Sequence, residues 1–167
     1  MMQITIHSMQ PKHYERVGTI YKQGIDSHHC TFESDVPTWE GFDANHLPFC
    51  RFVVLNEREE VIGWTALSQT SSRSCFEGVA EVSIYLDQHV IGQGIGEQLL
   101  NYLITESEQN GIWSLISGIF PENVASLRLH QKCGFRYVGY REKMGKTREG
   151  VFRDVLFMER RSLKVGV

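Results

Sequence analysis

A run of glycines at alternate positions is the clearest chemical signal in this sequence. Gly92, Gly94 and Gly96 follow residues 81–86, where apolar and polar side chains alternate as in a pleated strand. A helix pattern begins directly after them. The first amides of a helix have no internal partner and carry partial positive charge. Without Cβ atoms in the way, they can approach an anionic oxygen closely. Residues 91–97 are therefore predicted to hold a pyrophosphate, the alternative being a tight connection without a ligand.

Two common phosphate-binding motifs do not fit this turn. The dinucleotide fingerprint needs a further glycine where Glu97 stands. The P-loop needs Gly-Lys followed by Ser or Thr, and no such triplet follows the turn. The pattern therefore indicates some other phosphate-bearing cofactor.

A second segment, residues 123–135, reads Asn-Val-Ala-Ser-Leu-Arg-Leu-His-Gln-Lys-Cys-Gly-Phe. It resembles the Asn-x-x-Ser…Lys-x-Gly-Phe segment of the GNAT superfamily of N-acetyltransferases, which use acetyl-CoA. The glycine turn resembles that superfamily's Arg/Gln-x-x-Gly-x-Gly/Ala motif, with Ile91 as a departure where Arg or Gln is usual. Within the superfamily, four features resemble the phosphinothricin and methionine-sulfoximine N-acetyltransferases. They are residues 31–33, residues 80–85, His130 and residues 152–155.

The resemblance implies that an amine attacks the thioester directly, helped by a base and an acid. An aliphatic ammonium titrates well above pH 7, at about 10.4 for lysine, so a positioned base matters. Glu81 is the candidate base, directly or through a water; the alternative is a strand-surface glutamate in an ion pair. His130 is the candidate acid for the CoA sulfur, and the alternative is a helix histidine packed beside Phe135. Tyr85 is a second candidate donor.

The same resemblance assigns the binding residues. The pantetheine arm is expected to pair with the strand edge at Ser83, Ile84 and Tyr85, as an added strand would. The pyrophosphate is expected to meet the amides of Ile91, Gly92, Gln93, Gly94, Ile95 and Gly96, and Asn123 to bond the arm from the far side. The acceptor is expected beside Phe32, Glu33, Arg73, Phe76, Glu81 and Gly118. Arg73 suits an anionic group, although Ser71 replaces a lysine that the branch often has.

Periodicity places these residues on alternating elements. Strands are predicted at residues 2–7, 50–55, 61–69, 81–86, 112–120, 135–143 and 151–160. Helices are predicted at 11–24, with Gly24 as its end, and at 37–47, 94–109 and 124–132. The sequence therefore predicts one α+β domain over residues 1–167, layered α/β/α. The resemblance adds the GNAT arrangement: a mixed, mostly antiparallel sheet of about seven strands, splayed between the fourth and fifth, with about four helices.

Composition excludes several classes of partner. The net charge of −3 offers no basic field for nucleic acid. No apolar run reaches the roughly 18 residues that cross a membrane, and no signal peptide is expected at the N-terminus. Four scattered cysteines favour reduced thiols in a cytoplasmic protein, and His28, His29 and Cys30 lack a further ligand pair for a metal. The resemblance suggests a homodimer through the closing strands, near Val155 and Phe157.

Three functional hypotheses remain at this point. The first is transfer of acetyl from acetyl-CoA to the α-amine of a small, anionic, amino-acid-like acceptor such as phosphinothricin, methionine sulfoximine or methionine sulfone. The second is a GNAT enzyme for another amine, such as a protein N-terminus or an antibiotic. The third is a CoA-binding module that has lost catalysis.

Overall fold

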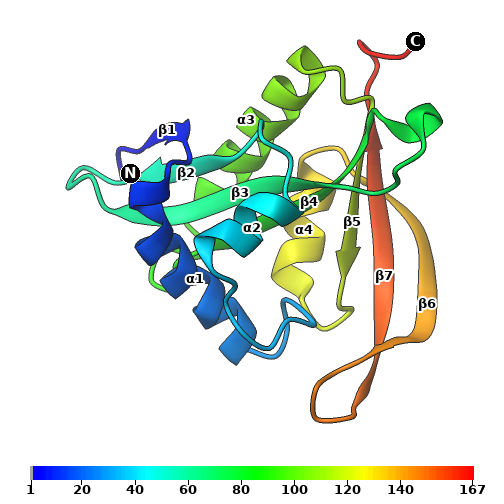
Figure 1. The fold of residues 1–167 in the computed structure, drawn as a ribbon, viewed down its shortest axis with the longest axis horizontal. Helices are drawn as coiled ribbons and strands as arrows, with labels where there is room; N and C mark the ends of the chain where they lie inside the picture. The colour runs from blue at the N-terminus through cyan, green and yellow to red at the C-terminus, as the bar shows by residue number, and fades with distance from the viewer. Residues whose placement is uncertain (1) are drawn as a thin grey trace.

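In the computed structural model, which describes residues 2–167, seven strands form one sheet in the order β1-β2-β3-β4-β5-β7-β6 (Figure 1). Neighbouring strands are antiparallel, except that β4 and β5 run parallel. The mixed, mostly antiparallel sheet is thereby confirmed. The strands are β1 (Thr5–Ser8), β2 (Phe52–Leu55), β3 (Val61–Gln69), β4 (Val79–Leu86), β5 (Ser114–Ile119), β6 (Arg136–Lys146) and β7 (Phe152–Arg161).

The sheet opens between β4 and β5. Their parallel ladder pairs Val79 with Ser114 and ends where Glu81 pairs with Ile116. In the described chain, β4 then continues to Leu86 and β5 to Ile119 without further pairing between them. Figure 1 shows β5 and β7 turned away from the direction of β3 and β4. The splay is therefore confirmed, and it leaves the backbone edge of β4 beyond Glu81 open.

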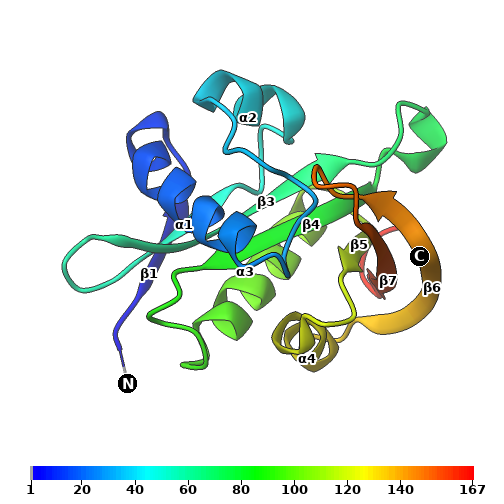
Figure 2. The ribbon, with the colours of Figure 1, turned by 90° about the horizontal axis from the view of Figure 1, so that it is seen from below.

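Helices cover both faces of the sheet, as Figure 2 shows. On one face lie α1 (Tyr14–Asp26), which follows a 3-10 turn, and α2 (Trp39–Asn45). On the other lie α3 (Ile95–Gln109) and α4 (Val124–Lys132). Each layer has its own apolar core, because β3 is buried on both faces. None of the helices in residues 2–167 combines the length and the apolarity that crossing a membrane needs.

Several predicted boundaries were wrong. The first strand lies at Thr5–Ser8 rather than 2–7, and the polar loop after β3 contains a 3-10 turn at Ser74–Phe76. Gly24 does not end α1, which continues to Asp26. A Cβ at Gly24 would lie 2.7 Å from the ring of Tyr85, so this glycine serves close packing against β4 rather than a helix stop.

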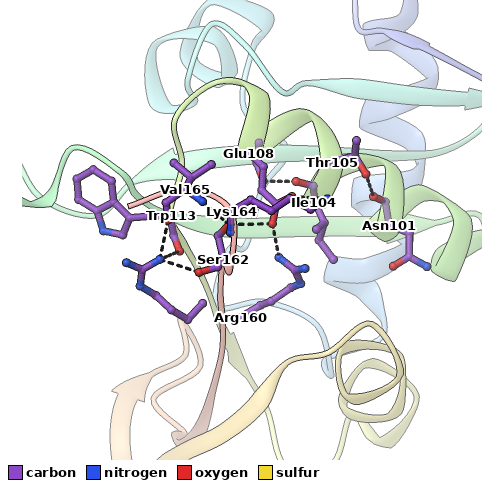
Figure 3. A network of polar contacts seen from close by, with 11 residues as sticks. Asn101, Ile104, Thr105, Glu108, Trp113, Arg160, Ser162, Lys164 and Val165 are labelled. Atoms are coloured by element: carbon purple, nitrogen blue, oxygen red, sulfur yellow. Dashed lines mark hydrogen bonds and ion pairs between the residues drawn. The ribbon is translucent and has the colours of Figure 1, made fainter. Parts of the chain in front are cut away.

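The chain after β7 is tied to the end of α3, as the polar network in Figure 3 shows. The buried carboxylate of Glu108 accepts a hydrogen bond from the Arg160 guanidinium at 3.0 Å and one from the Ser162 hydroxyl at 2.9 Å. Lys164 lies 3.5 Å from its other oxygen. These contacts fix β7, the strand beside the opened β5, against the helix that begins at the glycine turn.

Candidate active site

A cleft of about 1090 Å³ lies where β4 and β5 diverge. Its wall is formed by the loop between α1 and α2, the exposed half of β4, the glycine turn, β5, α4, and the pair β6–β7. Segments far apart in the sequence therefore meet around one opening. A cavity of this size accommodates an extended cofactor and a small acceptor together.

The glycine turn has the geometry that close approach of an anion requires. Gly92 and Gly94 have φ angles of +83° and +79°, which L side chains rarely adopt, and a Cβ on either would meet nothing within 4 Å. Gly94 is the N-cap of α3, and no side chain caps that end within residues 2–167. The start of α3 therefore has no capping side chain among the described residues and has open space beside its glycines, as the phosphate interpretation needs.

Four of the six predicted turn residues line the cleft: Ile91, Gly92, Gly94 and Gly96. Gln93 lies outside the lining, and Ile95 is 2% exposed in the core. Gly96 has a packing role, since a Cβ there would lie 3.2 Å from Leu86 and 3.3 Å from Leu129. A larger residue at Gly96 would therefore push α3 away from Leu86 and Leu129, whereas a larger residue at Gly94 would fill the predicted pyrophosphate site.

A buried carboxylate that the sequence analysis missed holds the entry to this turn. Asp87 follows β4 directly and is 3% exposed. One oxygen accepts hydrogen bonds from Arg16 and Gln23 of α1, and the other accepts the His89 amide at 2.8 Å. Burial alone would raise the pKa of Asp87, but hydrogen bonds from His89, Gln23 and Arg16 outweigh it and hold the pKa at about 2. The only signal in the sequence is an Asp between strand and turn.

Glu81 occupies the point of divergence. It is the last residue of β4 that pairs with β5, it lies opposite Ser68 of β3, and its side chain is open to the cleft. Burial raises the pKa of its carboxyl above the ordinary value. In the described part of the chain Glu81 forms no ion pair, which removes the main structural alternative for this residue.

His130 lies on α4, among the residues that line the cleft, and is 1% exposed. Its Nδ1 is 2.7 Å from the Ser126 carbonyl oxygen, which can only accept, so Nδ1 carries a hydrogen. Its Nε2, 2.9 Å from the Ser117 hydroxyl of β5, then accepts from that group. Burial lowers the pKa of His130. The ring also packs edge-on against Phe135, with the ring centroids 4.9 Å apart, so the packing that the alternative described is present.

The family follows from the sequence as a whole. The profile of the acetyltransferase (GNAT) family matches residues 20–135 of this chain. The chain belongs to the GNAT family. The GNAT fold is also that of a phosphinothricin acetyltransferase from Sinorhizobium meliloti, solved in complex with acetyl-CoA. That structure is 26% identical, with a TM-score of 0.88 over 99% of this chain and 91% of that one.

Curated relatives within the GNAT family are N-acyltransferases. The chain is 32% identical to the L-amino acid N-acyltransferase MnaT of Escherichia coli, over 71% of this chain and 68% of the relative. It is 30% identical to the L-methionine sulfoximine/L-methionine sulfone acetyltransferase of Salmonella typhimurium, over the same shares. This GNAT protein is an acetyl-CoA-dependent N-acetyltransferase.

The remaining predicted residues divide between cleft and surface. Phe32, Glu33, Gly118 and Asn123 line the cleft, as do Ser83, Ile84 and Tyr85 of β4. Asn123 also caps α4 by accepting the Ser126 amide at 3.2 Å. The structure does not bring Arg73 and Phe76 to this GNAT cleft: both are exposed, and the Arg73 guanidinium lies over the Phe76 ring at 5.5 Å.

Tyr85 is a structural part of the wall. Its ring stacks between Tyr21 at 5.1 Å and Trp64 at 4.8 Å. Burial, followed by the influence of Tyr21, raises its pKa far above the ordinary value. A phenol with so high a pKa is a poor proton donor to a thiolate, which favours His130 over Tyr85.

Val155 and Phe157, the residues named with the expected dimer contact, line the cleft. The apolar side chains exposed on this part of the sheet belong to β6 and the start of β7: Tyr137, Val138, Tyr140, Met144 and Phe152.

Proposed function

We propose that this enzyme transfers acetyl from acetyl-CoA to the α-amine of a small amino-acid-like acceptor, with Glu81 as the base. The position of Glu81 carries the proposal: an unpaired carboxylate at the floor of the splay, facing the cleft, with its pKa raised by burial. A base works best when its pKa is nearer the operating pH. The names of the relatives, which act on L-amino acids and on methionine sulfoximine and sulfone, support the acceptor class.

The proton path uses groups on both walls. Glu81 takes a proton from the ammonium, directly or through a water, and the free amine attacks the thioester carbonyl. The tetrahedral adduct then loses its second nitrogen proton to solvent. When the C–S bond breaks, the Ser117 hydroxyl passes its hydrogen to the thiolate, and His130, in the minor protonated form that its lowered pKa leaves, returns a hydrogen to Ser117 through Nε2. His130 ends neutral, as the hydrogen bonds at 2.7 Å and 2.9 Å describe it, and solvent recharges it.

Acetyl-CoA is held mainly by backbone in this proposal. The open edge of β4 at Ser83, Ile84 and Tyr85 pairs with the pantetheine amides, since that edge lacks a β5 partner. The amides after Gly92 and Gly94 receive the pyrophosphate. Asn123 offers its side chain from the opposite wall. The absence of an Arg or Gln at Ile91 leaves the backbone as the principal phosphate contact.

One observation favours a second candidate function, acetylation of a neutral or cationic amine. The cleft contains the carboxylates Glu33, Glu81 and Glu97, of which Glu97 pairs with Lys132, and Arg73 lies outside its lining. Within residues 2–167, the lysine and arginine that line the cleft, Arg128 and Lys132, both lie on α4 at the cofactor wall. An anionic acceptor would then depend on movement of Arg73 toward the cleft.

A thiol-release assay separates these functions. Purified protein with acetyl-CoA is offered phosphinothricin, methionine sulfoximine, methionine sulfone, neutral amino-acid amides and a protein N-terminal peptide. Preference for the first three supports the proposed acceptor, and preference for the amides or the peptide supports the second candidate. Thiol release at the background rate with every amine, together with tight acetyl-CoA binding, would show a CoA-binding module and refute both.

We also propose a homodimer, formed through the exposed apolar side chains of β6 that Tyr137 and Tyr140 exemplify. Burial of such side chains between two copies would remove them from water. Sedimentation or light scattering measures the mass directly, and a monomeric mass at micromolar concentration would refute the proposal.

A further inference from the structure

The side of the cleft that Phe32 lines, where the acceptor is proposed to bind, packs against β6 and β7. The loop after α1 contributes Phe32, and the ring of Phe32 lies against β6 at Gly145. A Cβ built at Gly145 would lie 2.6 to 3.0 Å from three atoms of that ring, closer than real Cβ atoms approach. The missing side chain at Gly145 therefore provides the space that the Phe32 ring occupies.

Arg153 of the neighbouring strand supports the same ring indirectly, through Phe120. Gly145 and Arg153 are directly paired between β6 and β7, so they share one face of the sheet. The Arg153 guanidinium lies 4.2 Å from the centroid of Phe120, and Phe120 packs edge-on against Phe32 at 4.8 Å. The series Arg153, Phe120, Phe32 and Gly145 thus fixes the ring on both sides.

The loop itself is tied down at its two ends. Arg153 donates to the carbonyl oxygen of His28 at 2.8 Å, and Arg148 pairs with Asp35 at 3.1 Å. His28 has a φ of +59°, which is costly for a residue with a Cβ and requires support from its surroundings. The loop shape is therefore set by tertiary contacts from the β6–β7 pair.

The segment Phe152–Val155 also explains how Gly145 reaches this position. The register of β6 shifts between Arg141 and Gly145. Asp154 holds that irregularity by accepting the Lys143 amide at 2.6 Å and the Tyr140 hydroxyl. Irregular strands re-aim the residues that follow them, and here the residue presented to the loop is Gly145.

We propose that Gly145 is a specificity-determining residue and that Arg153 is a positioning residue. Together they fix Phe32 and thereby the size of the acceptor pocket, while the acetyl-CoA site on β4 and α3 is left untouched. This inference rests on the proposed function, because it assigns the acceptor to the side of the cleft that Phe32 lines.

The test compares two glycines of the same strand. Gly145→Ala displaces the Phe32 ring, whereas Gly139→Ala is the matched control, since a Cβ at Gly139 meets nothing within 4 Å and neither glycine has a positive φ. With the best amine from the thiol-release panel, Gly145→Ala is expected to raise the amine KM by about tenfold and to leave the acetyl-CoA KM within about twofold. Gly139→Ala is expected to change neither.

A double-mutant cycle keeps the inference testable if Gly145→Ala folds poorly. In a Phe32→Ala background the clash is gone, so adding Gly145→Ala should produce no further loss of Tm or rise in amine KM. Equal effects of Gly145→Ala with and without Phe32 would overturn the inference, as would an unchanged amine KM in the single variant. An enzyme that acetylates none of the amines refutes the proposed function instead, while the Tm cycle still reports on the contact between Phe32 and Gly145.

Discussion

Replacing Asp87 with Asn should cost stability at neutral pH and lose much of that cost in acid. The network around Asp87 lowers its pKa from the ordinary 3.8 to about 2. At about 1.4 kcal/mol per pKa unit, this contributes about 2 kcal/mol to the free energy of unfolding at pH 7. Because the folded-state pKa is the lower one, the contribution is complete above the unfolded pKa and is lost as pH falls toward 2. Roughly half remains at pH 3.

Urea unfolding of the wild type and of Asp87→Asn, each at pH 7 and pH 3, measures this contribution. The quantity compared is the loss of unfolding free energy caused by Asp87→Asn at pH 7 minus the loss at pH 3. Asp26→Asn is the matched control, because Asp26 pairs with Lys22 on the exposed surface of α1, where such pairs contribute about 0.3–0.5 kcal/mol. Asp87→Asn should also weaken acetyl-CoA binding, since Asp87 anchors the entry to the glycine turn. The reasoning fails if the destabilisation is the same at both pH values, or no larger than that of Asp26→Asn.

Three further predictions concern the reaction itself. Glu81→Gln should lower kcat by about 10²–10⁴-fold and retain the affinity for acetyl-CoA. The kcat of the wild type should fall as pH drops through the raised pKa of Glu81. Steady-state kinetics across pH test both predictions. Gly94→Val should abolish measurable acetyl-CoA binding in calorimetry, because the valine side chain would fill the predicted pyrophosphate site. Wild-type affinity for acetyl-CoA would contradict pyrophosphate binding at the glycine turn. Ser117→Ala should lower kcat by up to about 10² without changing acetyl-CoA affinity, and an unaltered kcat would remove Ser117 from the proton path.

The sequence by itself determined the elements whose signals are local. Residues 61–69 and 81–86 were predicted as strands and lie in β3 and β4, and the span predicted for α4, 124–132, agrees with the structure. The glycine turn is equally local, since the absence of Cβ permits the positive φ that Gly92 and Gly94 adopt. Such features depend on neighbours within one or two turns of chain, so residue type and spacing suffice to predict them.

Only the tertiary structure decided which side chains meet around the cleft. Asp87 pairs with Arg16 across 71 positions of the sequence, and Ser117 of β5 reaches His130 of α4. Neither pair has a periodicity that a linear sequence could reveal. Arg73 shows the converse, because the family resemblance suggested an acceptor contact, whereas Arg73 lies outside the lining of the cleft. Contacts of this kind depend on how elements pack, and packing is a property of the folded chain as a whole.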